Sequence, residues 1–352
     1  MSLRLLKGKR ARVALAVCLM AVAGVIGGAL ASRSAAPDVR YHSAHVTVGG
    51  EVYRYLAFVP SSYRAADRVP LVVVLHGCRT TADQQALASG YNEVAQRRGF
   101  IVLYPDVDAT DQMEGGCWKG IWDPRAEGRG RGDARAVAAM TSAVMHRWRI
   151  DPARVYAIGI SAGAFETAIL GASYPDLYAA IGIHSGAAYG GGEPGCVTSG
   201  ESPAGTRTLA LAALAAMARH ARVMPVIVFH GDRDLVIPYA CGQAAVQQWL
   251  ETDNLVLGGE HRPPLPTSPT SLRPGTVTGG LRYTVASYLG GDGCAVIQFW
   301  TVHGMGHAWS GGSGDPSIAL YTDPQGPSAA AASSAFFLRW SLHGPTGICR
   351  TG

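Results

Sequence analysis

A five-residue segment in the middle of the chain, residues 159–163 (Gly-Ile-Ser-Ala-Gly), most constrains how this sequence folds. Residues 154–158 before it form an apolar run that predicts a buried strand, and residues 164–173 after it predict a helix. A Gly-x-Ser-x-Gly segment between a strand and a helix is typical of a nucleophile elbow. In that turn the serine is strained and its hydroxyl exposed, and only glycine fits two residues to either side. The context, more than the pentapeptide itself, makes Ser161 a candidate nucleophile.

Predicted strands and helices alternate along the rest of the chain. In chain order, they are a hairpin over 45–59, a strand over 71–75, a helix from 81 to before 99, a strand over 101–104 that Pro105 ends, a helix over 137–148, a strand over 179–183, a helix over 208–220, a strand over 223–229, a helix over 244–250, strands over 281–288 and 296–302, and a helix over 329–342. Residues 254–280, rich in Gly, Pro, Ser and Thr, predict a surface loop. The alternation predicts an α/β fold, with a mostly parallel central sheet and helices on both faces.

The amino-terminal residues differ from the rest in composition. An apolar run over 13–31 ends in Ala-Leu-Ala, as secretory signals do. Its 19 residues are also long enough for an uncleaved membrane anchor, which is the alternative interpretation. We therefore expect a signal peptide over 1–31, a flexible lead-in over 32–44 and a single catalytic domain over 45–352. The basic residues before the apolar run are Arg4, Lys7, Lys9, Arg10 and Arg12.

The charge of the chain comes from this leader. The full sequence has 30 basic and 25 acidic residues, and the five basic residues of the leader account for the net charge of +5. The remaining chain has no net charge, so composition gives no argument for nucleic-acid binding. After signal cleavage we also expect no stable membrane partner.

The cysteines agree with export to an oxidising compartment. One of the seven, Cys18, lies in the leader, and the other six allow up to three disulfides in 15 pairings. No spacing of cysteine or histidine suggests a zinc site, and the sequence predicts neither a metal nor a cofactor.

A serine nucleophile needs a base, and the base needs an orienting acid. When the serine sits on an elbow, Asp or Glu and then His follow it along the chain. Asp234 lies just past the predicted strand over 223–229 and is preferred to Asp232, which a turn explains equally well. His307 lies on a glycine-flanked loop past the last strand and is preferred to His303, which sits at the strand end.

An acyl-transfer reaction also needs hydrogen-bond donors for the developing oxyanion. The backbone N–H groups of Ala162, after the nucleophile, and of Cys78, on the loop after the strand over 71–75, are the candidates. A disulfide between Cys78 and Cys117 would hold this loop rigid and bring Trp118 to the cleft. Alternatively, Cys78 is a buried small residue without a partner.

Several segments together resemble the secreted esterases of the polyhydroxybutyrate depolymerase type, over about residues 45–342. They are His76-Gly77-Cys78, Cys117-Trp118, residues 129–133, residues 151–156, residues 159–163, His184-Ser185-Gly186, residues 306–312 and residues 321–327. The resemblance implies an α/β-hydrolase fold with Ser161 as nucleophile, His307 as general base and acid, and Asp234 as orienting acid. Members of that family also include feruloyl and acetylxylan esterases that act on plant polysaccharides.

We therefore expect a secreted, cofactor-free serine carboxylesterase. Its substrate stays open among hydroxyalkanoate oligomers or polymer, feruloyl or acetyl esters of polysaccharides, and small lipophilic esters. A feruloyl or acetylxylan esterase and an acyltransferase on the same fold are the alternatives, and a binding protein that has lost catalysis is the rival from another class. Trp118, Trp122 and Trp309 are candidates for lining an acyl groove, although buried packing explains each of them equally well. The sequence gives no indication of the oligomeric state.

Overall fold

The computed structural model describes residues 40–108, 115–191, 195–199 and 205–349. The predicted signal peptide and most of the predicted lead-in lie outside these residues. The lead-in is nevertheless shorter than predicted, because the first strand already begins at Tyr41. Within the described part of the chain, we find no helix with the length and apolarity needed to cross a membrane.

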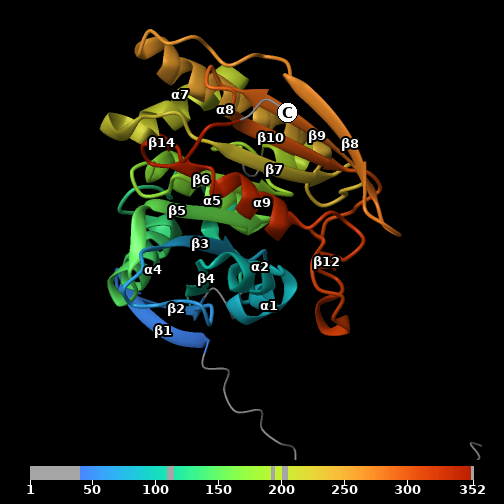
Figure 1. Cartoon of the computed structure of the whole chain (residues 1–352). Helices are drawn as coiled ribbons and strands as arrows, with labels where there is room; N and C mark the ends of the chain where they lie inside the picture. Colours follow the sequence, from blue (N-terminus) through green and yellow to red (C-terminus); the bar gives the residue numbers. More distant parts are fainter. Residues whose placement is uncertain (1–39, 109–114, 192–194, 200–204, 350–352) are drawn as a thin grey trace, which may run out of the picture. The chain divides into compact units, whose positions relative to one another are not determined.

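A ten-stranded sheet in the order β1-β2-β4-β3-β5-β6-β7-β10-β9-β8 organises the fold (Figure 1). The six strands from β4 to β10 in this order are parallel, and antiparallel strands extend the sheet at both ends. The strand bounds are β1 Tyr41–Val48, β2 Glu51–Phe58, β3 Val69–Leu75, β4 Ile101–Asp108, β5 Ile150–Ile160, β6 Ala180–His184, β7 Val226–Gly231, β8 Ser271–Thr276, β9 Arg282–Leu289 and β10 Ala295–Val302. The central strands are buried on both faces, which explains their continuous apolar runs.

Helices cover both faces of this sheet. Figure 1 shows α1 (Ala82–Ala88), α2 (Tyr91–Arg98) and α9 (Ala329–Phe337) on the near face, where α2 and α9 contact each other. The helices α4, α5, α7 and α8 form a second connected group. The bounds of the remaining elements are α4 Gly132–Arg147, α5 Ala162–Ser173, α6 Cys196–Ser199, α7 Thr206–Met217, α8 Tyr239–Gly259, the short turns Lys119–Ile121, Ala218–His220 and Pro316–Ile318, and the small strands β11 Trp309–Ser310, β12 Thr322–Asp323, β13 Trp340–Ser341 and β14 Gly344–Pro345.

The structure corrects three of the predicted elements. The single helix predicted from residue 81 is two helices, because Gly90 between them has a left-handed backbone, with a φ of 71°. Pro105 does not end β4, since parallel pairing with β3 stops at Leu103 and the amide hydrogen that proline lacks is not needed on that side. The predicted loop over 254–280 contains the end of α8 and the edge strand β8, where Pro274 is tolerated.

Three disulfides join cysteines that are far apart in the chain. They are Cys78–Cys117, Cys196–Cys241 and Cys294–Cys349. The first ties the segment after β3 to the segment after β4, so it fixes a loop at the carboxyl ends of the parallel strands.

Buried carboxyl groups lie beneath α5. Glu166 is fully buried, and a Cβ at Gly120 would lie only 2.5 Å from its Oε2 atom. Burial, together with the charges of Glu127 and Asp133, raises the pKa of Glu166 well above its usual value. Burial likewise raises the pKa of Glu127 to about 7. The folded state therefore holds protons on these groups at pH values where the unfolded chain has released them.

The protonation of these buried carboxyl groups makes the stability of the fold depend on pH. A carboxyl group with a raised folded-state pKa costs no stability below its unfolded pKa of about 4.3, and stability falls as the pH rises from there toward the folded-state value. We therefore expect Glu166→Gln to match the wild type near pH 4.5 and to be more stable than the wild type at pH 8, because the glutamine side chain has no proton to lose. Denaturant unfolding at both pH values measures this, with Glu51→Gln on the exposed end of β2 as the control. A parallel pH dependence in all three proteins would contradict it.

Candidate active site

The structure places Ser161 in a strained turn between β5 and α5. Its φ and ψ are 56° and −125°, a conformation that side-chain-bearing residues rarely adopt. A Cβ at Gly159 would lie 2.2 Å from the Gly163 carbonyl oxygen, and one at Gly163 would lie 2.4 Å from that of His76. Both positions therefore need glycine, as the sequence pattern indicates. The Ser161 amide donates to the carbonyl of His184 at the end of β6 (3.0 Å), which anchors the turn to the sheet.

Both of the aspartates considered above pair with a histidine. Asp234 Oδ2 accepts a hydrogen bond from His307 Nδ1 (2.8 Å), and Asp232 Oδ2 accepts one from His303 Nδ1 (2.9 Å). The two pairs differ in their surroundings. The Asp234 side chain is completely buried, whereas those of Asp232 and His303 are about one-third exposed (33% and 35%). Of the two histidines, His307 lines the same pocket as Ser161.

The surroundings of Asp234 keep its carboxylate charged and fixed. Its second oxygen accepts hydrogen bonds from the amides of Val236 (3.0 Å) and Ile237 (2.9 Å). Burial alone would raise the pKa of Asp234, but the hydrogen bond and charge of His307, with the Ile237 amide, hold it below its usual value. An ionised carboxylate bonded to Nδ1 leaves the other ring nitrogen of His307 free to accept a proton.

Two further histidines lie behind this pair, at the ends of β6 and β7. Burial, with the neighbouring His230 and His307, lowers the pKa of His184 to about 3, so its ring is neutral. Its Nε2 atom accepts from the Ser310 amide (3.0 Å), and its ring stacks on Trp309. His230 is also buried, and its Nε2 atom donates to the Ile237 carbonyl (2.9 Å). Both support the loops that carry Asp234 and His307.

The loop after β7, which carries Asp234, and the loop after β10, which carries His307, are also hydrogen-bonded to each other. The amide of Arg233 donates to the Met305 carbonyl (3.1 Å), and the amide of Gly304 donates to Asp232 Oδ1 (2.7 Å). A Cβ at Gly231 would lie 2.2 Å from the Met305 carbonyl oxygen, so the backbones meet directly. Asp232 and His303 thus link the two loops.

Ser161 and His307 open into a pocket of about 290 Å³. Its wall includes Ile318, the last residue of the short turn Pro316–Ile318, and the nearby residues Leu320 and Tyr321. Apolar side chains are exposed in this wall, since Leu320 is 86% exposed and Val236 is 57% exposed. These apolar side chains favour an alkyl group of the substrate in this part of the pocket.

The loop after β3 lies against the serine. A Cβ at Gly77 would contact the Cβ of Ser161 at 3.3 Å, and Cys78 lines the pocket. The Trp118 indole donates to the His76 carbonyl (2.9 Å), and the Cys78–Cys117 disulfide ties the same loop from the other side. Ala162, the other candidate oxyanion donor, is the first residue of α5 and is fully buried.

The structure corrects the predicted tryptophan groove. Trp118 and Trp309 are completely buried, and the indole of Trp309 donates to the Ser89 carbonyl (3.0 Å). Trp122 is 53% exposed but does not line the pocket of Ser161. Buried packing therefore explains Trp118 and Trp309, and none of the three tryptophans forms the wall of the candidate site.

Sequence reasoning missed the residues that do form this wall. Arg79, Gln85, Leu320 and Tyr321 all line the pocket. For Arg79 a signal was present, because it directly follows the candidate oxyanion donor Cys78. For Leu320 the sequence held no such signal, because this residue does not follow a predicted strand.

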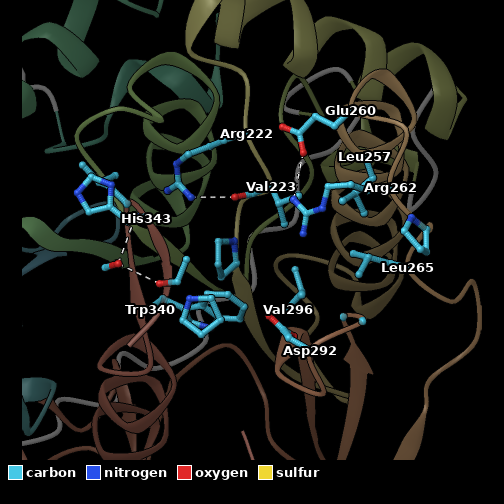
Figure 2. A pocket seen from close by; sticks show the side chains of 18 residues that line it. Arg222, Val223, Leu257, Glu260, Arg262, Leu265, Asp292, Val296, Trp340 and His343 are labelled. Carbon is cyan, nitrogen blue, oxygen red and sulfur yellow. Dashed lines mark hydrogen bonds and ion pairs between the residues drawn. The ribbon is translucent and has the colours of Figure 1, made fainter. Parts of the chain in front are cut away.

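A second pocket of about 410 Å³ lies at the amino-terminal end of β7, away from these strand ends (Figure 2). Figure 2 shows Arg222 directed toward the carbonyl of Val223, and Glu260 beside Arg262. The Arg222 guanidinium also donates to the carbonyls of Pro175 and Tyr178. Arg222, Glu260 and Arg262 thus already have hydrogen-bonding or ion-pair partners. No hydrogen bond between a histidine and a carboxylate, like that of His307 and Asp234, is found among the described residues that line this pocket. Within the described ranges, no cluster of side chains suited to holding a metal ion is found.

Known proteins resemble this chain over most of its length. The family model of esterase PHB depolymerases matches residues 53–262. Poly(3-hydroxyalkanoate) depolymerase C of Paucimonas lemoignei is 29% identical over 261 residues, which cover 71% of this chain and 56% of that protein. An acetylxylan esterase of Coprinopsis cinerea is 26% identical over 264 residues, which cover 71% of this chain and 64% of that protein.

A solved structure supports the fold assignment. An acetyl xylan esterase from Aspergillus awamori superposes with a TM-score of 0.60 at 21% identity, over 79% of this chain and 97% of that one. The predicted α/β-hydrolase fold is therefore confirmed, with a sheet more mixed than expected because antiparallel strands extend it at both ends. From the match over residues 53–262, we conclude that this chain belongs to the esterase PHB depolymerase family.

Proposed function

We propose that this protein is a serine carboxylic ester hydrolase with Ser161 as nucleophile, His307 as general base and acid, and Asp234 as orienting acid. One observation carries the proposal: a serine on a strained elbow and a histidine bonded to a buried carboxylate line one pocket. Family membership supports the same reaction class. The chain spans only 56% and 64% of the length of the two relatives described above. That it shares their esterase activity is therefore part of this proposal.

The proposed reaction proceeds through an acyl-enzyme. His307 accepts the proton of the Ser161 hydroxyl as its oxygen attacks the ester carbonyl, and then returns that proton to the departing alcohol. Water, deprotonated by His307, then attacks the acyl-enzyme, and His307 returns the proton to the Ser161 oxygen as the acid leaves. Asp234 fixes the ring of His307 and stabilises its positive charge while it holds the proton.

The oxyanion formed in each step is bound by backbone amides in this proposal. Ala162 offers its amide at the start of α5, where the partial positive charge of a helix also favours an anion. Cys78 offers the second amide from a loop that a disulfide and the Trp118 indole hold in place. Loss of one such donor costs about 3 kcal/mol of transition-state stabilisation.

For the substrate, we propose hydroxyalkanoate esters, either oligomers or polymer. The apolar residues Ile318 and Leu320 in the wall, with Val236 beside His307, suit the short alkyl groups of such esters. The relative named as a depolymerase of poly(3-hydroxyalkanoate) supports the same class. Three disulfides among the described residues support a site of action outside the cytoplasm.

Covalent labelling tests the proposed nucleophile. A fluorophosphonate reacts with a serine only when a neighbouring base activates it. We expect stoichiometric labelling of the purified protein, with the adduct mapped by mass spectrometry to the peptide that contains Ser161. Labelling at another serine, or none at all, would overturn the assignment.

A further inference from the structure

Arg79 stands at the candidate active site without a partner for its charge. It lines the pocket of Ser161 and His307, and its side chain is exposed. Among the described residues, it forms no ion pair or side-chain hydrogen bond, and no acidic side chain lines this pocket. The pocket wall therefore presents a permanent positive charge that nothing in it neutralises.

The backbone at Arg79 is fixed in an unusual conformation. Its φ of 63° lies in the left-handed region, which costs energy for any residue except glycine. The Arg79 amide donates to the Gly115 carbonyl (2.8 Å), and the preceding residue, Cys78, is bonded to Cys117. The guanidinium is thus attached to a constrained point of the loop, one residue after the candidate oxyanion donor.

A second donor lines the same pocket. The side chain of Gln85 on α1 is only 4% exposed, and its Nε2 atom is buried without a hydrogen-bond partner. A buried donor of this kind costs free energy unless a ligand or water accepts its hydrogen bond. The neighbouring Gln84 differs, since its Oε1 atom accepts from the Thr81 amide and caps the helix. Gln85 is thus a pocket-lining residue whose amide nitrogen has no acceptor among the described residues.

We propose that Arg79 and Gln85 form a subsite for a carboxylate, so that the enzyme prefers esters whose acid or alcohol part carries a free carboxylate. This inference rests on the proposed function, since it concerns the substrate of that same site. A guanidinium binds a carboxylate through charge-assisted hydrogen bonds. Short hydroxyalkanoate oligomers, which end in a free carboxylate close to an ester bond, meet this requirement.

Two matched substrate pairs test the subsite, one for each side of the ester. The linear dimer of 3-hydroxybutyrate and its terminal amide place the charge, or its neutral counterpart, on the alcohol side. Mono-p-nitrophenyl glutarate and p-nitrophenyl glutaramate place it on the acyl side. Within each pair the scissile bond is the same, so the ratio of kcat/KM for the charged and the neutral ester cancels any general damage to the site.

We expect the wild type to prefer the charged ester about tenfold in at least one pair, and Arg79→Gln to lose that preference. Arg79→Lys should restore part of it because the charge returns without the planar fork. The preference should also fall as the salt concentration rises. Arg98→Gln, an exposed arginine on α2, is the matched control and should keep the wild-type ratio.

The outcomes separate this inference from the proposed function. If the wild type hydrolyses the neutral esters but Arg79→Gln lowers the ratio less than about threefold in both pairs, the subsite is wrong and the proposed function stands. If the wild type hydrolyses none of the four esters, the proposed function fails and the subsite fails with it.

Discussion

Ser161→Ala is expected to abolish ester hydrolysis while leaving the fold intact. Without the hydroxyl no acyl-enzyme forms, and in serine hydrolases such a loss lowers kcat by about a millionfold. Hydrolysis of p-nitrophenyl butyrate measures the effect, and circular dichroism with thermal unfolding checks the fold. Because the Ser161 side chain projects into the pocket rather than into the core, we expect little change in stability.

Ser185 offers a closely matched control for this substitution. It follows β6, the strand next to β5, and its φ of 47° is also in the left-handed region. We expect Ser185→Ala to retain activity within about tenfold, since its hydroxyl is buried away from the pocket. Turnover by Ser161→Ala equal to that of the wild type would refute the nucleophile assignment.

Asp234→Asn is expected to lower kcat by about ten-thousandfold with little change in structure. The amide oxygen takes over the hydrogen bonds from Val236 and Ile237, which turns the amide nitrogen toward His307 Nδ1. The histidine ring must then carry its proton on Nε2, where it cannot accept one from Ser161. Steady-state kinetics on p-nitrophenyl butyrate measure the loss.

Asp232→Asn separates the role of the two aspartates. It changes the same group in the same loop, but its partners are His303 and the Gly304 amide. We expect a loss of less than about tenfold, through slight loosening of the histidine loop. A larger loss in Asp232→Asn than in Asp234→Asn would move the orienting role to the more exposed pair.

The central part of the fold was predictable because local patterns and tertiary packing agree there. The buried run of β5, the glycines around Ser161 and the apolar helix α5 each specify the same strand–turn–helix unit. The Thr81–Gln84 capping box at the start of α1 is another such local signal. Such signals lie within a few residues of each other, so the sequence alone reveals them.

Elements that depend on distant partners were predicted less well. The edge strand β8 has little apolar alternation and contains Pro274, and only pairing with β9 makes it a strand. The break at Gly90 depends on how α1 and α2 pack on the sheet. The helix predicted over 244–250 is much longer, because α8 packs against β7 and β10 along its length.

The same distinction applies to the candidate site. Each proposed chemical group follows a strand directly, so strand order along the chain was enough to select Ser161, Asp234 and His307 as candidates. Whether a tryptophan faces solvent or core depends on tertiary packing, which is why the sequence left Trp118 and Trp309 open between an acyl groove and buried packing. The wall formed by Leu320 and Tyr321 comes from a segment with no strand to locate it.

The origin of that wall has a consequence for how new specificities arise in this protein. The proposed catalytic groups lie on loops that are bonded to the sheet, whereas residues 318–321 belong to a later segment that contributes side chains to the pocket. This segment is joined to the histidine loop by its backbone, since the Trp309 amide donates to the Tyr321 carbonyl (2.9 Å) and β11 pairs with β12. Side-chain exchanges at Leu320, which keep this pairing, are therefore expected to change which esters fit while leaving the backbone around His307 in place.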